Sequence, residues 1–372
     1  MGALEAAVEK LNPPKQIGPF LLRYCERNPR IGQGAGSRGV EGERLIFCYQ
    51  NAFELALARF QSKPHLRELP KNPIPVYLLD ILALPYGSPF MSVNVKGDPF
   101  IVLPSRIAQF TPQAELEYAA ACAVHEFLHV LREVVRPYAE LMLWRWFDEA
   151  TAVWGESLVV EGNRTCYEYY LDWSDKPEVP IDNEMQSYGA ALFVRYLTVR
   201  QDEGFVSRVW KEAKRGESPL QTIKRLLPKN QKEGIFHDYC VDSYFAQAGG
   251  RPTLFAEVHE HYGGRAISES FDAARGGTIE FSTEVDPLAC RFYRFYPGPG
   301  VTRMEATLDD DASGVRASLA GVGAGLSRTV KQGKKPVVRV GKPPMDHVIL
   351  VLSNDGSRKL TDTKISVRVS AA

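Results

Sequence analysis

The sequence is poor in several features that would point to particular classes of protein. None of its six cysteines lies in a Cys-x-x-Cys pair, so nothing indicates a zinc site built from cysteines alone. Its 45 basic and 45 acidic side chains cancel, so no overall charge favours nucleic acid or an anionic membrane. No apolar run has the length of a membrane span, and residues 1–14 lack the pattern of a signal peptide. We therefore expect a soluble protein that binds no nucleic acid and spans no membrane. Its location stays open: exported if a leader was trimmed, otherwise cytoplasmic.

Internal repeats and low-complexity tails are also missing. The pattern of apolar residues along the chain changes clearly only once. The 372 residues are enough for two or three domains. After Gly277, short alternating runs separated by turns replace the longer helical patterns. We predict an α+β fold in three parts. They are an N-terminal α/β part with an edge strand (1–112), a helical part with the functional site (113–277) and an antiparallel β-sandwich (278–372).

Apolar spacing, prolines and capping residues predict the individual elements of the first two parts. Prolines at both ends of the run 99–104 are typical of a strand at a sheet edge, where an extended peptide can pair by main-chain hydrogen bonds. A second strand is expected at 74–80. The expected helices are 45–60, 112–136, 146–160, 182–199, 205–214 and 219–227.

The run His125-Glu126-Phe127-Leu128-His129 lies in an apolar, proline-free stretch. Residues four apart share one face of a helix, so both imidazoles would aim at one point, with Glu126 beside them. Two neutral imidazoles and a carboxylate base are the arrangement of zinc hydrolases. The alternative is two ordinary helix histidines with a solvated glutamate, but burying them on an apolar helix is costly unless they are paired or metal-bound. We therefore predict a site for one Zn²⁺.

Zinc held by two histidines needs one more protein ligand and an open position. The next acidic pair downstream is Asp148-Glu149, far enough from His129 for a turn and the start of an antiparallel helix. With this pair the sequence resembles the gluzincin metallopeptidases, of the thermolysin and aminopeptidase-N groups. Their second motif, of the Trp-x-x-Glu-Gly-x-x-x-Tyr-x-Glu kind, is matched at Trp146, Glu149, Trp154 and Glu156. The resemblance covers roughly residues 74–227.

The resemblance implies that His125, His129 and Glu149 are zinc ligands and that Glu126 is the general base. Glu156, two turns beyond Glu149, would fix a ligand imidazole by accepting a hydrogen bond from its other nitrogen. Asp148 points away from the Glu149 face of the helix, and we interpret it as a surface or capping carboxylate.

A hydrolase of this kind also needs a donor for the oxyanion that forms on the substrate carbonyl. Family members use a tyrosine or histidine further along the chain. The run that begins Ser187-Tyr188-Gly189 resembles the start of one family helix, although its tyrosine is displaced. Tyr188 is therefore the first candidate, with a core aromatic as the alternative. His237 is the second, with a surface position as the alternative.

The activity implied by the resemblance is zinc-dependent hydrolysis of a peptide or protein. Aminopeptidases of this branch carry Gly-x-Met-Glu-Asn on the edge strand, and residues 97–104 lack it, which favours an endopeptidase. Two alternatives stay open: a binding or scaffold protein without turnover, and an aminopeptidase without the usual amine-binding motif. The C-terminal sandwich resembles accessory modules of exported peptidases and would suit contact with a surface or a glycan.

Overall fold

The computed structural model has the predicted α+β composition, with seven α-helices and three β-sheets among the residues described. Contacts divide the chain into two compact units, each of which is discontinuous in sequence. The first unit consists of residues 1–166 and 200–219, and the second of residues 167–199 and 220–372. The structure describes residues 8, 11–24, 43–63, 68–79, 88–105, 112–137, 143–160, 169, 173, 175–232, 234–247, 267–308, 314–323, 328–332, 336–340, 345–356 and 359–371.

The first unit is built on a five-stranded sheet in the order β1-β2-β3-β5-β4. Its inner pairs, β2–β3 and β3–β5, are parallel, whereas both outer pairs are antiparallel. The strands are β1 (Lys15–Ile17), β2 (Phe20–Arg23), β3 (Ile74–Leu79), β4 (Phe90–Val93) and β5 (Pro99–Pro104). The strands expected at 74–80 and 99–104 are thus confirmed.

The position expected for the strand at 99–104 is wrong. β5 lies inside the sheet, with β3 on one side and β4 on the other. Pro99 and Pro104 are tolerated because they stand at the two ends of β5, where the ladder of hydrogen bonds begins and stops. The short antiparallel strand β4 forms the edge of the described sheet next to β5, and β1 forms the opposite edge.

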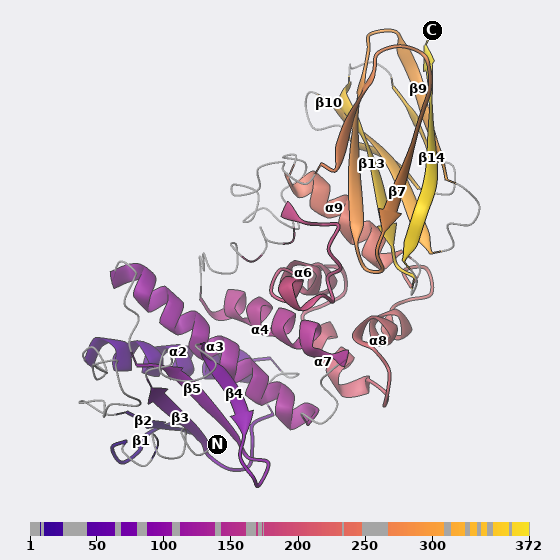
Figure 1. Cartoon of the computed structure of the whole chain (residues 1–372). Coiled ribbons are helices and arrows are strands. Elements are labelled where there is room, and N and C mark those ends of the chain that lie inside the picture. Colours follow the sequence, from indigo (N-terminus) through magenta and orange to yellow (C-terminus); the bar gives the residue numbers. More distant parts are fainter. Residues whose placement is uncertain are drawn as a thin grey trace. The chain divides into compact units, whose positions relative to one another are not determined.

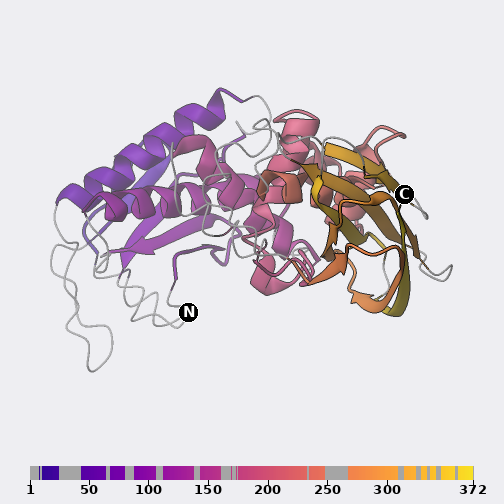
Figure 2. The same ribbon diagram turned by 90° about the horizontal axis from the view of Figure 1, so that it is seen from above.

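Helices α2 (Glu43–Gln61) and α3 (Pro112–Val135) run side by side and pack against this sheet (Figures 1 and 2). Phe53 and Phe127 bring the two helices against Phe20 of β2 in one aromatic cluster, all fully buried. α3 ends shortly before Pro137, as predicted. Helices α4 (Arg145–Val159) and α7 (Phe205–Glu212) complete the first unit, and both pack against α3.

Three helices of the second unit are α6 (Ala191–Arg200), α8 (Pro219–Leu226) and α9 (Ile235–Gln247). The helix expected over 182–199 begins only at Ala191, and a 3₁₀ turn (η3, Glu184–Gln186) precedes it. The Asn183 side chain accepts a hydrogen bond from the Met185 backbone and caps this turn, which stops the helix from extending backwards. Helix α9 was not predicted.

The C-terminal part is a sandwich of two sheets around one core, as predicted. Its sheets have the orders β11-β10-β13-β8-β6 and β12-β9-β14-β7. All described pairings are antiparallel except the parallel pair β6–β8. Because β6 belongs to the first of these sheets, the sandwich begins before the expected boundary at 278. The strands are β6 (Glu269–Ala273), β7 (Gly277–Val285), β8 (Cys290–Pro297), β9 (Val301–Leu308), β10 (Val315–Gly323), β11 (Arg328–Gln332), β12 (Val337–Arg339), β13 (Met345–Asn354) and β14 (Leu360–Ala371).

Two further features of the described part concern its cysteines and its helices. Three cysteines in the described part of the chain are free thiols: Cys122, Cys240 and Cys290. Among the described helices, none combines the length and the apolar character needed to cross a bilayer.

Candidate metal centre

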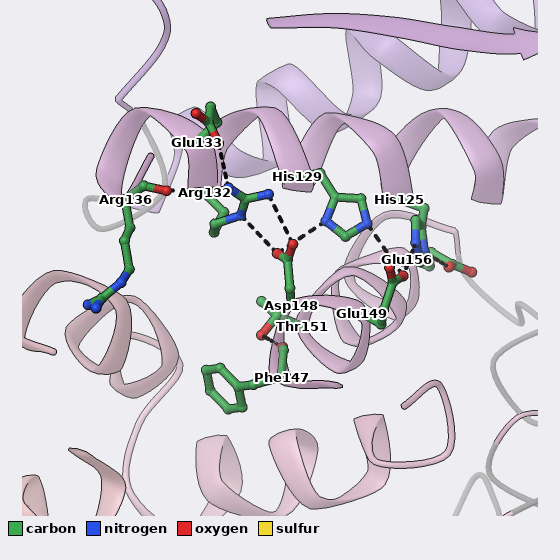
Figure 3. A network of polar contacts seen from close by, with 10 residues as sticks. All are labelled: His125, His129, Arg132, Glu133, Arg136, Phe147, Asp148, Glu149, Thr151 and Glu156. Atoms are coloured by element: carbon green, nitrogen blue, oxygen red, sulfur yellow. Dashed lines mark hydrogen bonds and ion pairs between the residues drawn. The ribbon is translucent and has the colours of Figure 1, made fainter. Parts of the chain in front are cut away.

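The site is formed where α3 and α4 cross in the first unit (Figure 3). His125 and His129 lie one turn apart on α3 and point their rings at Glu149, near the start of α4. Glu149 Oε2 is 3.1 Å from His125 Nε2 and 3.5 Å from His129 Nε2. One potential ligand atom from each of the three residues lies within 4.8 Å of the others. The structure thus brings together the three side chains that the sequence predicted as ligands.

The other ring nitrogen of each histidine faces a second carboxylate. His125 Nδ1 is 2.8 Å from Glu156 Oε1, which is the contact expected for Glu156. His129 Nδ1 is 3.1 Å from Asp148 Oδ1, although the N–H is not aimed squarely enough to count as a hydrogen bond. Both rings are therefore turned so that Nε2 faces the shared point.

The interpretation of Asp148 as a surface or capping carboxylate is wrong. Its side chain is buried and lies between His129 and Arg132, which comes from the next turn of α3. Arg132 donates to both oxygens of Asp148, from Nε to Oδ1 and from Nη2 to Oδ2, each at 3.0 Å. Asp148 and Glu149 both point toward α3 and reach the same His129 ring, Asp148 at Nδ1 and Glu149 at Nε2 (Figure 3).

Glu126 is 5 % exposed, and its Oε2 has no hydrogen-bond partner in the structure. The strand β4 packs against α3, and the backbone of Met91 on β4 acts to lower the pKa of Glu126. Burial raises the pKa of Glu126, and this outweighs the opposite effect of His125 and His129. A buried carboxylate with one unpartnered oxygen and a raised pKa is suited to accept a proton from a water molecule.

The two histidines and Glu149 shift one another's pKa values in opposite directions. Burial lowers the pKa of His125, but hydrogen bonds to Glu149 and Glu156 outweigh it and raise the pKa to about 10. Burial acts on His129 in the same way, and Asp148 and Glu149 raise its pKa well above the usual value. Burial favours protonation of Glu149, yet the neighbouring imidazoles hold its pKa well below the usual range. Without a cation, the site is thus a network of charged pairs.

The donor set fits a zinc ion. In a tetrahedral site with ligands at about 2.1 Å, neighbouring ligand atoms are roughly 3.4 Å apart. The two measured distances from Glu149 Oε2, 3.1 and 3.5 Å, are close to that value. Two imidazole nitrogens and one carboxylate oxygen also match the ligand preference of catalytic zinc, with one position left for water.

Tyr188, the first candidate for the oxyanion donor, lies in the second unit just before α6, and 38 % of its surface is exposed. Its ring stacks on that of Tyr169 at 4.8 Å between centroids. Gly189, which follows it, packs so closely on Trp173 that a Cβ atom there would come within 2.9 Å of the tryptophan side chain. The segment that carries Tyr188 is therefore held by local packing. Tyr196, on α6, is fully buried.

His237, the second candidate, is buried rather than at the surface. Its Nδ1 is 2.7 Å from the Ser353 hydroxyl and its Nε2 is 2.7 Å from the Ser318 hydroxyl, both on strands of the sandwich. Both ring nitrogens are thus occupied within the second unit, which leaves neither one for a substrate oxyanion. Its contacts connect α9 to β13 and β10.

The sequence analysis missed two residues that contact the site, Arg132 and Met91. Arg132 lies three residues after His129, and this spacing on a helix places it beside the ligand. That spacing was the signal that could have found it. Met91 has no such signal, because it reaches Glu126 through its backbone and not through its side chain.

The comparisons with known proteins assign no activity to this chain. Residues 109–247 match a family of unknown function, DUF6055. This segment includes both helices that carry the three candidate ligands. A comparison with curated proteins found no match.

Proposed function

We propose that this chain is a gluzincin-like zinc peptidase that hydrolyses internal peptide bonds of a peptide or protein. The observation that carries the proposal is the convergence of His125, His129 and Glu149 on one point, with their ligand atoms within 4.8 Å of one another. The adjacent Glu126 carboxylate, buried and with Oε2 unpartnered, supplies the base that this chemistry needs.

Each residue then has a definite task. His125, His129 and Glu149 would hold the zinc ion, which would supply a Lewis acid to polarise the scissile carbonyl. Glu126 takes a proton from the attacking water and later gives it to the leaving amine. Its raised pKa brings its proton affinity closer to neutral pH, which favours both transfers. Tyr188 remains the first candidate for the oxyanion donor, because its ring reaches solvent whereas that of His237 is buried.

The edge strand β4 is the natural place for the substrate main chain. An extended peptide can add to an open strand edge by backbone hydrogen bonds. β4 packs against α3, the helix that carries Glu126, and the Met91 backbone influences the pKa of that carboxylate, so this strand lies beside the proposed base. β4 has the sequence Phe-Met-Ser-Val and offers no carboxylate for a free substrate amine, which favours an endopeptidase.

The decisive test combines metal analysis with a single exchange. The purified protein should contain one zinc ion per chain and cleave peptides in a broad unlabelled pool, as followed by mass spectrometry. Glu126→Gln should retain zinc and lower the rate by roughly 100- to 10 000-fold, because it removes the general base. The matched control is Glu54→Gln, which changes an exposed helix glutamate in the same unit. Zinc without any cleavage by the unmodified protein would contradict the peptidase proposal.

One observation supports a second candidate, a binding or scaffold protein without turnover. The charged pairs among His125, His129 and Glu149 satisfy one another, so the geometry does not require an ion. In that case the protein would fold and bind its partner equally well after exhaustive chelation. Cleavage that depends on Glu126 rejects this candidate.

A further inference from the structure

We propose that Arg132 is a positioning residue of the metal centre, which acts through Asp148 on His129 and on the start of α4. This inference rests on the proposed zinc site. It concerns a residue outside the three ligands and the base.

Both carboxylate oxygens of Asp148 are held by Arg132. The Arg132 guanidinium holds both of them in a fork, at 3.0 Å from Nε and 3.0 Å from Nη2. Oδ1 is also the atom that lies 3.1 Å from His129 Nδ1. Since both carboxylate oxygens are held, the Asp148 side chain cannot rotate without breaking a contact to Arg132. The orientation of the His129 ring therefore depends on a guanidinium that never touches it.

Arg132 is itself held in place by two further acceptors. Its Nη1 donates to Glu133 Oε2 at 2.5 Å and to the backbone carbonyl of Arg136 at 3.3 Å (Figure 3). Only 4 % of its side chain is exposed, and 10 % of that of Asp148. A pair that is this well buried is weakly screened by solvent and holds its geometry.

The pair also acts on the third ligand. Asp148 directly precedes Glu149 in the sequence, so the fork ties the backbone at the start of α4 to the C-terminal half of α3. Two ligands on α3 and one on α4 remain at bonding distance only if the two helices keep their spacing at this point. Lysine cannot replace the fork, because an ammonium group is a single point of charge and cannot bind both oxygens in fixed geometry.

The experiment measures zinc affinity by competition with a chelator, together with the visible spectrum of the cobalt-substituted protein, which reports ligand geometry. Residues that orient metal ligands change metal affinity by roughly 10- to 100-fold when they are replaced. We expect a loss in this range for Arg132→Gln, a smaller loss for Arg132→Lys, and an altered cobalt spectrum for both.

The matched control is Arg208→Gln. Arg208 forms a similar fork with Asp202, at 3.0 and 2.7 Å, but this pair is half-exposed and comes from another part of the same unit. Its loss should change neither the affinity nor the spectrum.

A second variant shows whether Arg132 acts through Asp148. In an Asp148→Asn background, a further Arg132→Gln exchange should lower zinc affinity by less than twofold.

The outcomes separate this inference from the proposed function. If the unmodified protein takes up no zinc, the proposed site fails and the role of Arg132 fails with it. If it binds zinc and Arg132→Gln binds with the same affinity and the same cobalt spectrum, only the inference is overturned, even if the variant melts earlier. If Arg132→Gln does not fold, Arg132→Lys decides, and unchanged affinity in that variant also overturns the inference.

Discussion

Buried histidines occur in both units of this protein, and their neighbours give them opposite properties. In the first unit, His125 and His129 each face a carboxylate with Nδ1 and share Glu149 at Nε2. In the second unit, His237 lies between two serine hydroxyls. The pKa of His125 is raised to about 10 by its carboxylate partners, whereas burial lowers the pKa of His237 to about 4.

The comparison teaches that burial alone does not identify a functional histidine. All three histidine residues are less than a tenth exposed. His125 and His129 are surrounded by negatively charged carboxylates. A metal cation can take the place of the ring protons and balance this charge, so the pair is suited to hold a metal. His237 has neutral hydroxyl partners and one N–H to donate, so it is suited to be a neutral link between a helix and a sheet.

The largest expected effect is on metal binding. His129→Ala should lower zinc affinity by more than the roughly 100-fold that marks the loss of a merely orienting residue, because it removes a ligand. His237→Ala should leave the zinc content unchanged. The measurement is bound metal per chain after dialysis against a weak chelator. Equal zinc content in the two variants would contradict the assignment of His129 as a metal ligand and of His237 as a structural residue.

Zinc binding should also release protons from the histidines of the first unit. His125, with its pKa at about 10, carries a proton at neutral pH in the metal-free protein, and the pKa of His129 is also raised by its carboxylate neighbours. Zinc binds only neutral imidazole, so its uptake at pH 7 should release at least one proton, and affinity should fall as pH falls. Calorimetry in buffers of different ionisation enthalpy gives this number. No dependence on the buffer would mean that the rings are already neutral.

Local spacing was sufficient to predict part of this site, and the limits of local spacing explain the rest. The separation of four between His125 and His129 fixes a shared face on any helix, and the resemblance of the second motif supplied Glu149 and Glu156. The surroundings of Asp148 depend on Arg132, from another helix, and no pattern within α4 contains that information. This is why neither the burial of Asp148 nor its contact with His129 was predicted.

The fold shows the same division between local and long-range information. Strands with alternating residues and helices with one apolar face were found. Helix α9 was missed because every residue from Ile235 to Phe245 except Asp238 is buried, so it has no amphipathic period. The order of the strands in the sheets also could not be predicted from the sequence. The four residues of β4 are all partly exposed, and only their pairing with β5 reveals which strand forms the edge.

A moderate effect is expected for the response of the second unit to pH. His237 has a pKa of about 4 when folded and about 6.5 when unfolded, so the unfolded chain binds a proton that the folded chain refuses. The free energy of unfolding is therefore unaffected above pH 6.5 and falls as pH drops towards 4, by about 2 kcal/mol between pH 7 and pH 5. Hydrogen exchange of α9 and β13 amides measures this loss. His237→Gln cannot take up the proton and should flatten the dependence between these two pH values; an equally steep dependence in this variant would assign the loss to other groups.

The smallest expected effect concerns His347, which is partly exposed and accepts or donates one hydrogen bond, at 2.7 Å, with the Tyr244 hydroxyl. Its pKa is lowered by burial and by Arg294, and Asp346 opposes them. Water can replace the lost partner at a ring that reaches solvent, so Tyr244→Phe should lower the free energy of unfolding by only about 1 kcal/mol. Chemical denaturation of the two proteins at pH 7 gives the difference. A loss of 3 kcal/mol or more, roughly the upper limit for an unsatisfied buried group, would mean that this histidine behaves like His237 and that exposure does not separate the two.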